Sequence, residues 1–443
     1  MPVLRYSAAP ETRESIAWRL FGEEEPGALI RGIAEGTVDL GPIDGDFDPS
    51  LQPRNASNPI DRHLDAVVDA SGLGDPSEPI VIFVHGFQFD PRIETEETET
   101  AKSTNPHVQL YRFSEAADED GIPGEPGSEY EHNSHATPWL RRATHDQTAE
   151  DFPGLAIGFG YESWGNELAD GTPSTGDFWR ALVNVDWQKG AFRNVYAQAY
   201  LDAEHAATAL AVIIDRISRL LEAKGDNRPI DLFAHSLGTR TVMLALDILA
   251  RKREQTRALD SVGRVLLLAG AASWIVTGKV LRNLMVARPD NPPEIFNFPS
   301  SEDAVISFLG ARASLKAASD SAGIEDSLWS RVTRFVKGGE MIGREGRPDL
   351  AAFAGPKKQY DHWVDIQLDD PATKRWGQSK DYTLRGDRKG TFDILKLEFK
   401  IETLDHWVHY TTPSNWELFR DILARVDGLT PEEVRAGILE ARG

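Results

Sequence analysis

One serine of this chain stands in a local pattern that favours nucleophilic chemistry. Residues 230–233 form a short apolar run of strand-forming residues, and from Thr239 the apolar positions recur with helical spacing. The intervening AHSLG places Ser236 at the apex of a strand, turn and helix, where its side chain clears both elements. The small residues Ala234 and Gly238 let the strand and the helix approach each other. The pattern therefore predicts an exposed nucleophile.

The first amide of the predicted helix supports this interpretation. The N–H of Leu237 is expected beside the serine, where it could donate a hydrogen bond to an oxyanion. A structural alternative is open, because serine is a favoured N-cap residue and Ser236 could simply bind an orphan amide of the helix. The order of possible partners further along the chain decides between the two interpretations.

The strand, the AHSLG turn and the helix resemble the α/β-hydrolase superfamily, in particular the lipases and esterases whose turn begins with alanine instead of glycine. The resemblance implies an α/β fold with a mostly parallel central sheet, helices on both faces and large insertions. It also implies a serine, an acid and a histidine that follow one another in this order along the chain.

A second part of the hydrolase pattern lies earlier in the chain. Residues 79–84, PIVIFV, predict a strand buried on both faces, and HGF follows directly. In the hydrolase pattern, this glycine lets the backbone bend so that the next amide points at the target of the nucleophile. The resemblance therefore implies the Phe87 amide as the second donor of the oxyanion hole, with the Gln88 amide as the alternative.

The acid is expected after another predicted strand. Residues 294–298, EIFNF, predict this strand, and PSSEDAV follows it. Hydrolases of this fold carry their acid on the corresponding loop, so the resemblance implies Asp303 as the residue that orients the histidine. Glu302 is the neighbouring alternative, and Asp303 could instead cap a following helix.

Two similar segments offer the histidine. YDHWVD at 360–365 continues into a strand-like alternation, which would place His362 at the entrance of a strand. LDHWVHY at 404–410 precedes a loop and a helical pattern, as the histidine loop of hydrolases does. The resemblance implies His406, and His409 and His362 are the alternatives.

Further elements are expected to hold these residues in place. Buried strands are predicted at 155–159 and 264–269, and a long amphipathic helix at 195–223 should deliver the chain to the strand before Ser236. Tyr161 and Trp164 follow the first of these strands and are candidates for lining a pocket or for packing.

The last helix is expected to begin with a capping box. Thr430 would be its N-cap, Pro431 its first residue, and Glu433 would reach back to the N-cap.

The domain organisation is expected to be one large domain with an appendage. Residues 1–75 predict a helical appendage outside the core pattern, in which 11–36 faintly resembles a LysM glycan-binding module. Residues 76–443 would form the hydrolase domain. Within it, 88–152 predicts an acidic surface loop and 311–390 a cap or side-layer over the site.

Composition excludes several classes of function. The net charge of -22 over 443 residues argues against binding of nucleic acid or of anionic membrane surfaces. The chain has no cysteine, which excludes disulfides, a cysteine nucleophile and thiolate metal sites. His132 and His135 have no helix context and no carboxylate at ligand spacing, so no metal site is expected there. The hydrolase resemblance implies no cofactor. The chain shows no signal-peptide pattern and no stretch long enough to span a bilayer, which predicts a cytoplasmic protein without stable membrane insertion.

The sequence thus predicts a serine hydrolase that cleaves carboxylic esters, small-molecule or lipid, through an acyl-enzyme. Acyltransferases, thioesterases and amidases use the same machinery, and the sequence does not separate them. The rival prediction is a non-catalytic, hydrolase-like binding module, favoured by the acidic insertions and the LysM-like start. The oligomeric state is left open.

Overall fold

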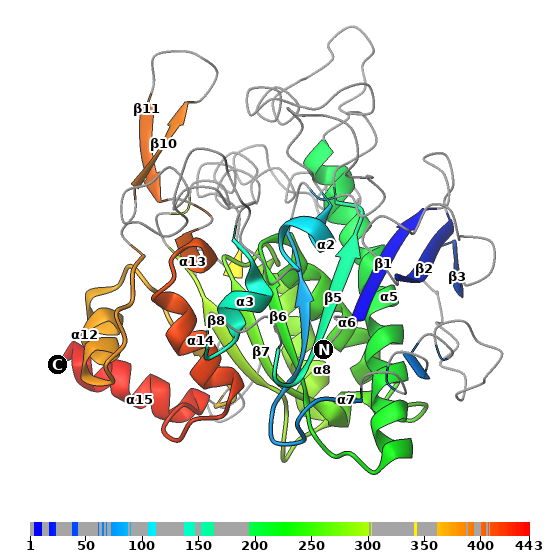
Figure 1. Cartoon of the computed structure of the whole chain (residues 1–443). Helices are drawn as coiled ribbons and strands as arrows, with labels where there is room; N and C mark the ends of the chain where they lie inside the picture. Colours follow the sequence, from blue (N-terminus) through cyan, green and yellow to red (C-terminus); the bar gives the residue numbers. More distant parts are fainter. Residues whose placement is uncertain are drawn as a thin grey trace, which may run out of the picture.

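In the computed structural model of the chain, nine strands of the described residues form one sheet with the order β3-β2-β1-β5-β4-β6-β7-β8-β9 (Figure 1). All neighbours from β1 to β9 in this order pair in parallel, and β2 and β3 are added to one edge by antiparallel pairing. The parallel strands are β1 (Leu4–Pro10), β4 (Ile80–Val84), β5 (Leu155–Tyr161), β6 (Ile230–His235), β7 (Val262–Leu268), β8 (Glu294–Phe298) and β9 (Trp363–Asp365). The edge strands are β2 (Ala17–Glu23) and β3 (Val38–Pro42). The chain therefore belongs to the α/β class.

The structure describes the following residues of the chain: 4–10, 17–23, 38–42, 61, 64, 65, 68, 72–86, 89, 105–111, 137–146, 152–163, 195–300, 303, 341, 342, 361–386, 389–393, 400–404, 406 and 408–443.

The central strands are buried on both faces, as their continuous apolar sequences predict. Every residue of β4, β5 and β6 is buried. A parallel sheet covered by helices on both sides requires such strands, because neither face meets water. The strands predicted near 79–84, 155–159, 230–233, 264–269 and 294–298 are confirmed.

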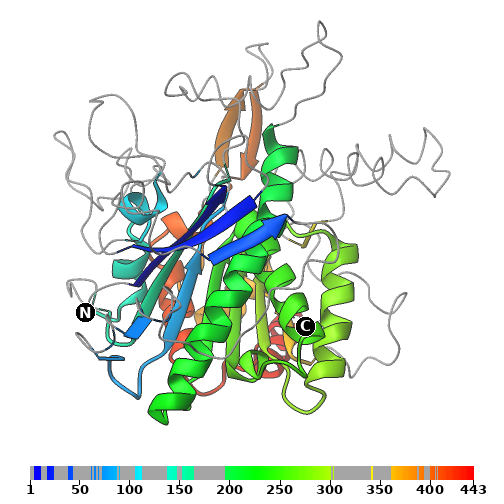
Figure 2. The same ribbon diagram turned by 90° about the vertical axis from the view of Figure 1, so that its right-hand side faces the viewer.

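One face of the sheet is covered by helices that connect consecutive strands. These helices are α5 (Val195–Lys224), α6 (Leu237–Arg251), α7 (Ala258–Ser261) and α8 (Trp274–Ala287). α6 packs between α5 and α8, and Figure 2 shows this layer. The aliphatic side chains of α5 and α6 and those of one face of the sheet form one continuous core. The long helix predicted at 195–223 is confirmed, and Gly225 follows its end with a φ of 70°.

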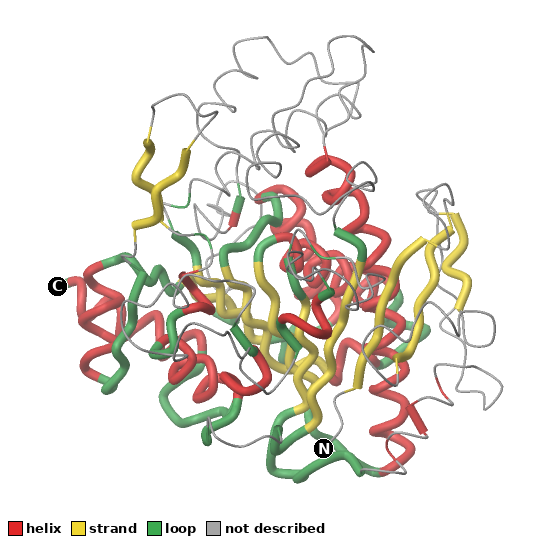
Figure 3. Tube along the Cα trace, turned by 45° about the horizontal axis from the view of Figure 1, so that its top comes forward, coloured by secondary structure: helices red, strands yellow, loops and turns green. Residues whose placement is uncertain are grey.

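The other face carries helices from the C-terminal part of the chain and from the segment between β4 and β5. They are α3 (Trp139–Ala143), α12 (Pro371–Ser379), α13 (Val408–Thr411), α14 (Asn415–Leu423) and α15 (Pro431–Arg442), while α2 (Pro106–Gln109) contacts β5. This second core is rich in aromatic rings, such as Phe233 of β6, which stacks on Trp416 at 5.0 Å between ring centroids. Helices thus lie on both sides of the strands (Figure 3).

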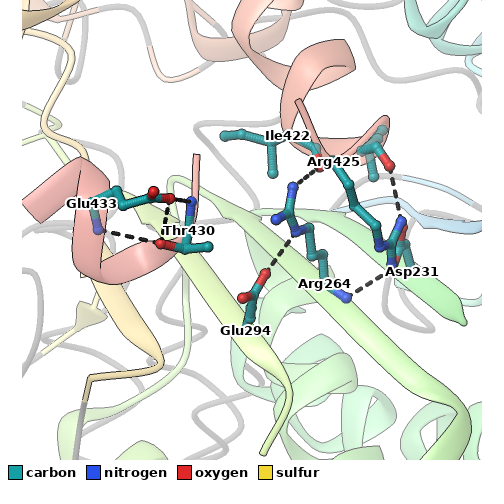
Figure 4. A network of polar contacts seen from close by, with 8 residues as sticks. Asp231, Arg264, Glu294, Ile422, Arg425, Thr430 and Glu433 are labelled. Carbon is teal, nitrogen blue, oxygen red and sulfur yellow. Dashed lines mark hydrogen bonds and ion pairs between the residues drawn. The ribbon is translucent and has the colours of Figure 1, made fainter. Parts of the chain in front are cut away.

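A partly buried ionic network attaches the C-terminal helices to the amino ends of the strands (Figure 4). The guanidinium of Arg425 binds both carboxylate oxygens of Asp231 at 2.6 and 2.8 Å. The backbone amide of Arg264 also donates to Asp231 at 2.7 Å, and its side chain donates to Glu294 and to the carbonyl of Ile422. Because Asp231 is fully buried, loss of its arginine would leave an uncompensated charge. The network holds α14 in register with the sheet.

The capping box of the last helix is also visible in Figure 4. The hydroxyl of Thr430 accepts the amide of Glu433 at 3.3 Å, and the Glu433 carboxylate accepts the amide of Thr430 at 3.0 Å. Pro431 stands at the first position of α15. This prediction is confirmed.

The N-terminal region differs from the expected helical appendage. β1 lies within the sheet beside β5, and Leu4, Tyr6 and Ala8 are completely buried. The stretch that includes residues 17–23 forms β2 and not a helix. The physical reason is that Leu4, Tyr6 and Ala8 alternate with period two, and that a short apolar run such as AWRLF fits a strand as well as a helix. The division at residue 75 therefore separates β1 from the sheet to which it belongs.

The two predicted insertions also contribute to the core where they are described. Tyr111 and Trp139, in the segment expected to be an acidic surface loop, are fully buried. In the 311–390 segment, the described strand β9 extends the central sheet and the described helix α12 packs on α15, so these two elements belong to a side-layer. Trp164, His132 and His135 lie outside the described residues, as do 304–340 and 343–360.

A hairpin of β10 (Lys389–Asp393) and β11 (Lys400–Leu404) stands apart from the main sheet on the side of its carboxyl ends (Figures 1 and 2). It leads directly to the segment that contains His406. Within the described ranges, none of the helices combines the length and the apolar character needed to cross a membrane.

Candidate active site

The topology places Ser236 and Gly86 at the topological switch point of the sheet, where the strand order changes direction. β4 and β6 are neighbours, but after β4 the chain continues to β5 on one side and after β6 it continues to β7 on the other. In open α/β sheets, such a point opens a crevice beyond the carboxyl ends of the strands, where ligands bind. Gly86 follows β4 closely, and Ser236 follows β6 directly.

Ser236 has the strained backbone expected of a serine thrust out of a sharp turn. Its φ is 52° and its ψ is -120°, a conformation that a non-glycine residue rarely adopts. Such strain persists only where the surroundings hold it. The Ser236 amide donates to Leu268 of β7 at 2.8 Å, and its carbonyl accepts the amides of Thr239 and Ala271 at 3.1 and 3.0 Å. The turn is therefore fixed by hydrogen bonds from both sides.

Close backbone approach explains the small residues of the turn. A Cβ atom on Gly238 would lie 2.3 Å from the carbonyl oxygen of His85 and 2.6 Å from that of Val84. A Cβ atom on Gly86 would lie 2.8 Å from the Cβ of Ser236. The first turn of α6 and the end of β4 thus touch through glycines, and the backbone at Gly86 lies beside the serine.

The hydroxyl of Ser236 does not cap α6. Its side chain makes no capping hydrogen bond, although the residue occupies the N-cap position. Within the described ranges the hydroxyl has no hydrogen-bond partner, so its oxygen remains uncommitted. The capping alternative therefore has no support in the geometry. The structure shows no hydrogen bond between the Ser236 hydroxyl and His406 within the described residues, and hydrogen bonds between a nucleophile and its base are often long without substrate.

Asp303 and His406 are brought together from positions that are far apart in the sequence. The Nδ1 atom of His406 lies 2.7 Å from Oδ2 of Asp303, and both side chains are buried. With Nδ1–H donating to the carboxylate, Nε2 is the unprotonated nitrogen of this imidazole tautomer. This is the arrangement in which an acid orients a histidine as a general base.

A third side chain, His235, connects the histidine loop to the turn. Its Nε2 lies 3.3 Å from the carbonyl oxygen of His406, and the two imidazole rings are 4.7 Å apart. Burial, with His406 and His409 nearby, holds the pKa of His235 well below its usual value, so its ring is neutral and its Nε2–H can donate. His235 is the last residue of β6 and directly precedes Ser236. The end of β6 therefore carries both the serine and the side chain that contacts the His406 backbone.

The two alternative histidines occupy different places. His362 lies at the amino end of β9, where its carbonyl accepts the amide of Ile295. Ser236 lies at the carboxyl ends of the parallel strands, so the two residues are on opposite sides of the sheet along the strand direction. His409 is fully buried, and burial lowers its pKa to about 4 against the opposing effect of Asp303. The 2.7 Å contact with the carboxylate belongs to His406.

Of the two predicted oxyanion donors, Leu237 is described and Phe87 is not. Leu237 is the first residue of α6, where the amides of a helix have no intrahelical acceptor. Its amide is therefore available to a ligand beside Ser236. Phe87, Gln88 and Glu302 lie outside the described residues.

Tyr161, a candidate for lining a pocket, is completely buried and stacks on His85, with 4.4 Å between ring centroids. In this position the ring packs against the end of β4. In the part of the chain that the structure describes, no group of three or more histidine, aspartate or glutamate side chains is arranged to hold a metal ion.

Two features of the site could not be recognised from sequence motifs. His235 is an ordinary variable position of the turn, and Ser163 lies beyond the strand β5 with no motif around it. Ser163 contacts the backbone of Phe89, 74 residues away, and His235 contacts that of His406, 171 residues away, so no local pattern could reveal these contacts.

The arrangement combines a strained, uncommitted serine, a histidine oriented by a buried carboxylate and a free helix amide at the carboxyl edge of one sheet. These are the components that acyl transfer through a serine requires. Comparison of the chain with protein-family models, with curated proteins and with solved structures finds no match, so the chemistry is argued from this geometry.

Proposed function

We propose that the protein is a serine hydrolase of carboxylic esters with an α/β-hydrolase fold. The observation that carries the proposal is the hydrogen bond between His406 and Asp303 at the sheet edge that also presents the strained Ser236. The strand-turn-helix around Ser236 and the chain order of serine, aspartate and histidine support the same assignment.

In the proposed reaction, Ser236 Oγ attacks the carbonyl carbon of the ester while Nε2 of His406 takes its proton. Asp303 holds the imidazole in the tautomer with Nδ1–H and stabilises the imidazolium that forms. The negative charge on the former carbonyl oxygen is stabilised by the Leu237 amide and by the amide that follows Gly86.

The tetrahedral intermediate then collapses. The bond to the leaving oxygen breaks, His406 returns its proton to that oxygen, and the alcohol departs from an acyl-enzyme on Ser236. Water attacks the acyl carbon while His406 takes its proton, the bond between that carbon and Ser236 Oγ breaks, and His406 returns the proton to Oγ as the carboxylic acid leaves. The proposed substrates are small-molecule or lipid esters, and the reaction needs no cofactor.

Turnover of p-nitrophenyl esters from acetate to palmitate tests this function. Release of p-nitrophenolate by the full chain is expected for at least part of the series. The Ser236→Ala variant should keep only a low rate, slightly above that of the uncatalysed reaction. The chain-length optimum would define the acyl group that the site accepts. Absence of turnover for all esters, or equal rates for the folded Ser236→Ala variant, would refute the proposed function.

A further inference from the structure

The peptide that follows β4 is held by two side chains from the same edge of the sheet. The carbonyl oxygen of Gly86 lies 2.7 Å from Nδ1 of His85 and 2.9 Å from Oγ of Ser163. All three residues are buried, and Gly86 lies against Ser236. The contacts therefore concern the backbone nearest to the serine.

The protonation of His85 follows from its two contacts. The backbone amide of Tyr161 can only donate, so Nε2 of His85, 2.9 Å away, accepts. Nδ1 must then carry the proton and donate to the Gly86 carbonyl. Burial lowers the pKa of His85 to about 3, which keeps the ring neutral and in this tautomer at neutral pH. With both nitrogens engaged, His85 is a fixed donor and not a general base.

Ser163, two residues after the end of β5, also contacts the Gly86 carbonyl. Its hydroxyl accepts the amide of Phe89 at 3.1 Å and donates to Gly86, and its own amide donates to the carbonyl of Phe89 at 2.9 Å. The hydroxyl also lies 3.2 Å from the Phe89 carbonyl. The segment after β4 is thus tied at two of its residues, Gly86 and Phe89, to the end of β5.

A fixed carbonyl also fixes an amide, because the C=O and the N–H of a planar trans peptide point in opposite directions. Two donors to the Gly86 carbonyl, from His85 and Ser163, therefore restrict rotation of the peptide plane that begins at Gly86. We propose that Ser163, together with His85, is a positioning residue of the oxyanion hole that keeps this amide aimed at the substrate oxygen.

The inference rests on the proposed hydrolase function and specifies how its second oxyanion donor is held. Without the Ser163 hydroxyl, one of two donors to the Gly86 carbonyl is lost and the Phe89 amide loses its acceptor. The peptide after Gly86 could then rotate. Rotation would weaken the hydrogen bond from its amide to the substrate oxyanion, or turn the Gly86 carbonyl toward the negative charge that develops on that oxygen. Loss of one oxyanion donor costs about 10²- to 10³-fold in rate, so partial misalignment should cost about 10-fold or more.

The test compares Ser163→Ala with Ser218→Ala in p-nitrophenyl ester hydrolysis and in thermal unfolding. Ser218 is a matched control, because its buried hydroxyl also makes a hydrogen bond, to Ser261 at 2.6 Å on the α5 layer. Both variants should unfold in one cooperative transition with only a modest fall in Tm, because each loses a buried hydroxyl that makes a hydrogen bond. For Ser163→Ala alone, kcat should fall at least about 10-fold while KM stays within about twofold, because the oxyanion forms only in the transition state.

A Ser163→Cys variant keeps the side-chain shape with a weaker donor, and its kcat should lie between those of the wild type and Ser163→Ala. It also carries the test if the alanine variant fails to fold. A kcat within twofold of the wild type in folded Ser163→Ala, or a higher KM with unchanged kcat, would overturn the inference and leave the hydrolase function intact. A wild-type protein without ester turnover would overturn both, and is recognised before any Ser163 variant is made.

Discussion

His406→Ala should lower kcat for ester hydrolysis by about 10⁴- to 10⁶-fold, the range found when the histidine of a serine triad is removed. The serine hydroxyl is a weak nucleophile at its own pKa, and the imidazole that takes its proton would be missing. KM should change little, because the base acts on the reacting atoms and not on the bound substrate. Steady-state rates with the best p-nitrophenyl ester measure this effect.

His362→Ala is the matched control for this prediction. His362 stands in an almost identical local sequence, DHWV, but lies at the amino edge of the sheet, so its loss should leave kcat within a few-fold of the wild type. An active His406→Ala enzyme together with an inactive, folded His362→Ala enzyme would show that His362, and not His406, is the base. His409→Ala should retain most of the activity for the same reason, since the carboxylate contact belongs to His406.

Gly86→Val should lower kcat by about 10²- to 10³-fold, through displacement of the backbone that faces the serine. A Cβ atom at this position would lie 2.8 Å from the Cβ of Ser236 and 3.1 Å from the carbonyl oxygen of His235. Neither atom can withdraw, because one belongs to the nucleophile and the other to the backbone of β6. The peptide after Gly86 must therefore move away from the site.

Gly263→Val controls for the general cost of a crowded glycine. A Cβ atom there would lie 2.6 Å from Nη2 of Arg425 and 2.7 Å from Oδ1 of Asp231, at the amino end of the sheet. This variant should lose stability but keep its kcat per folded molecule. Equal kcat values for folded Gly86→Val and the wild type would show that the backbone at Gly86 takes no part in the reaction.

The elements around Ser236 could be predicted because local sequence determines them. A strand buried on both faces needs a continuous apolar run, and the contact between α6 and β4 needs a glycine at position 238. Both requirements are readable without tertiary information. Asp303 follows a predicted strand and His406 precedes a loop and a helical pattern, which are the places that the hydrolase resemblance implies, and the structure places the two side chains in contact.

The remaining parts depend on contacts that no local pattern reveals. The sequence predicts residues 1–75 outside the core, yet β1 pairs with β5 across about 150 residues of sequence, where tertiary pairing outweighs a weak helical pattern. Trp139 lies within a segment rich in charge, but it packs on Phe83, Phe233 and Tyr410. His235 and Ser163 act through hydrogen bonds to backbone atoms far away in the sequence, and such bonds leave no periodic signal.

Covalent labelling by a fluorophosphonate, followed by intact mass and peptide mapping, tests the central claim most directly. The account predicts one adduct per chain, on the peptide that contains Ser236, with no adduct in Ser236→Ala and much slower labelling in His406→Ala. Labelling that persists in Ser236→Ala, an adduct on another residue, or no adduct on the folded wild-type protein would contradict the assignment of Ser236 as the nucleophile.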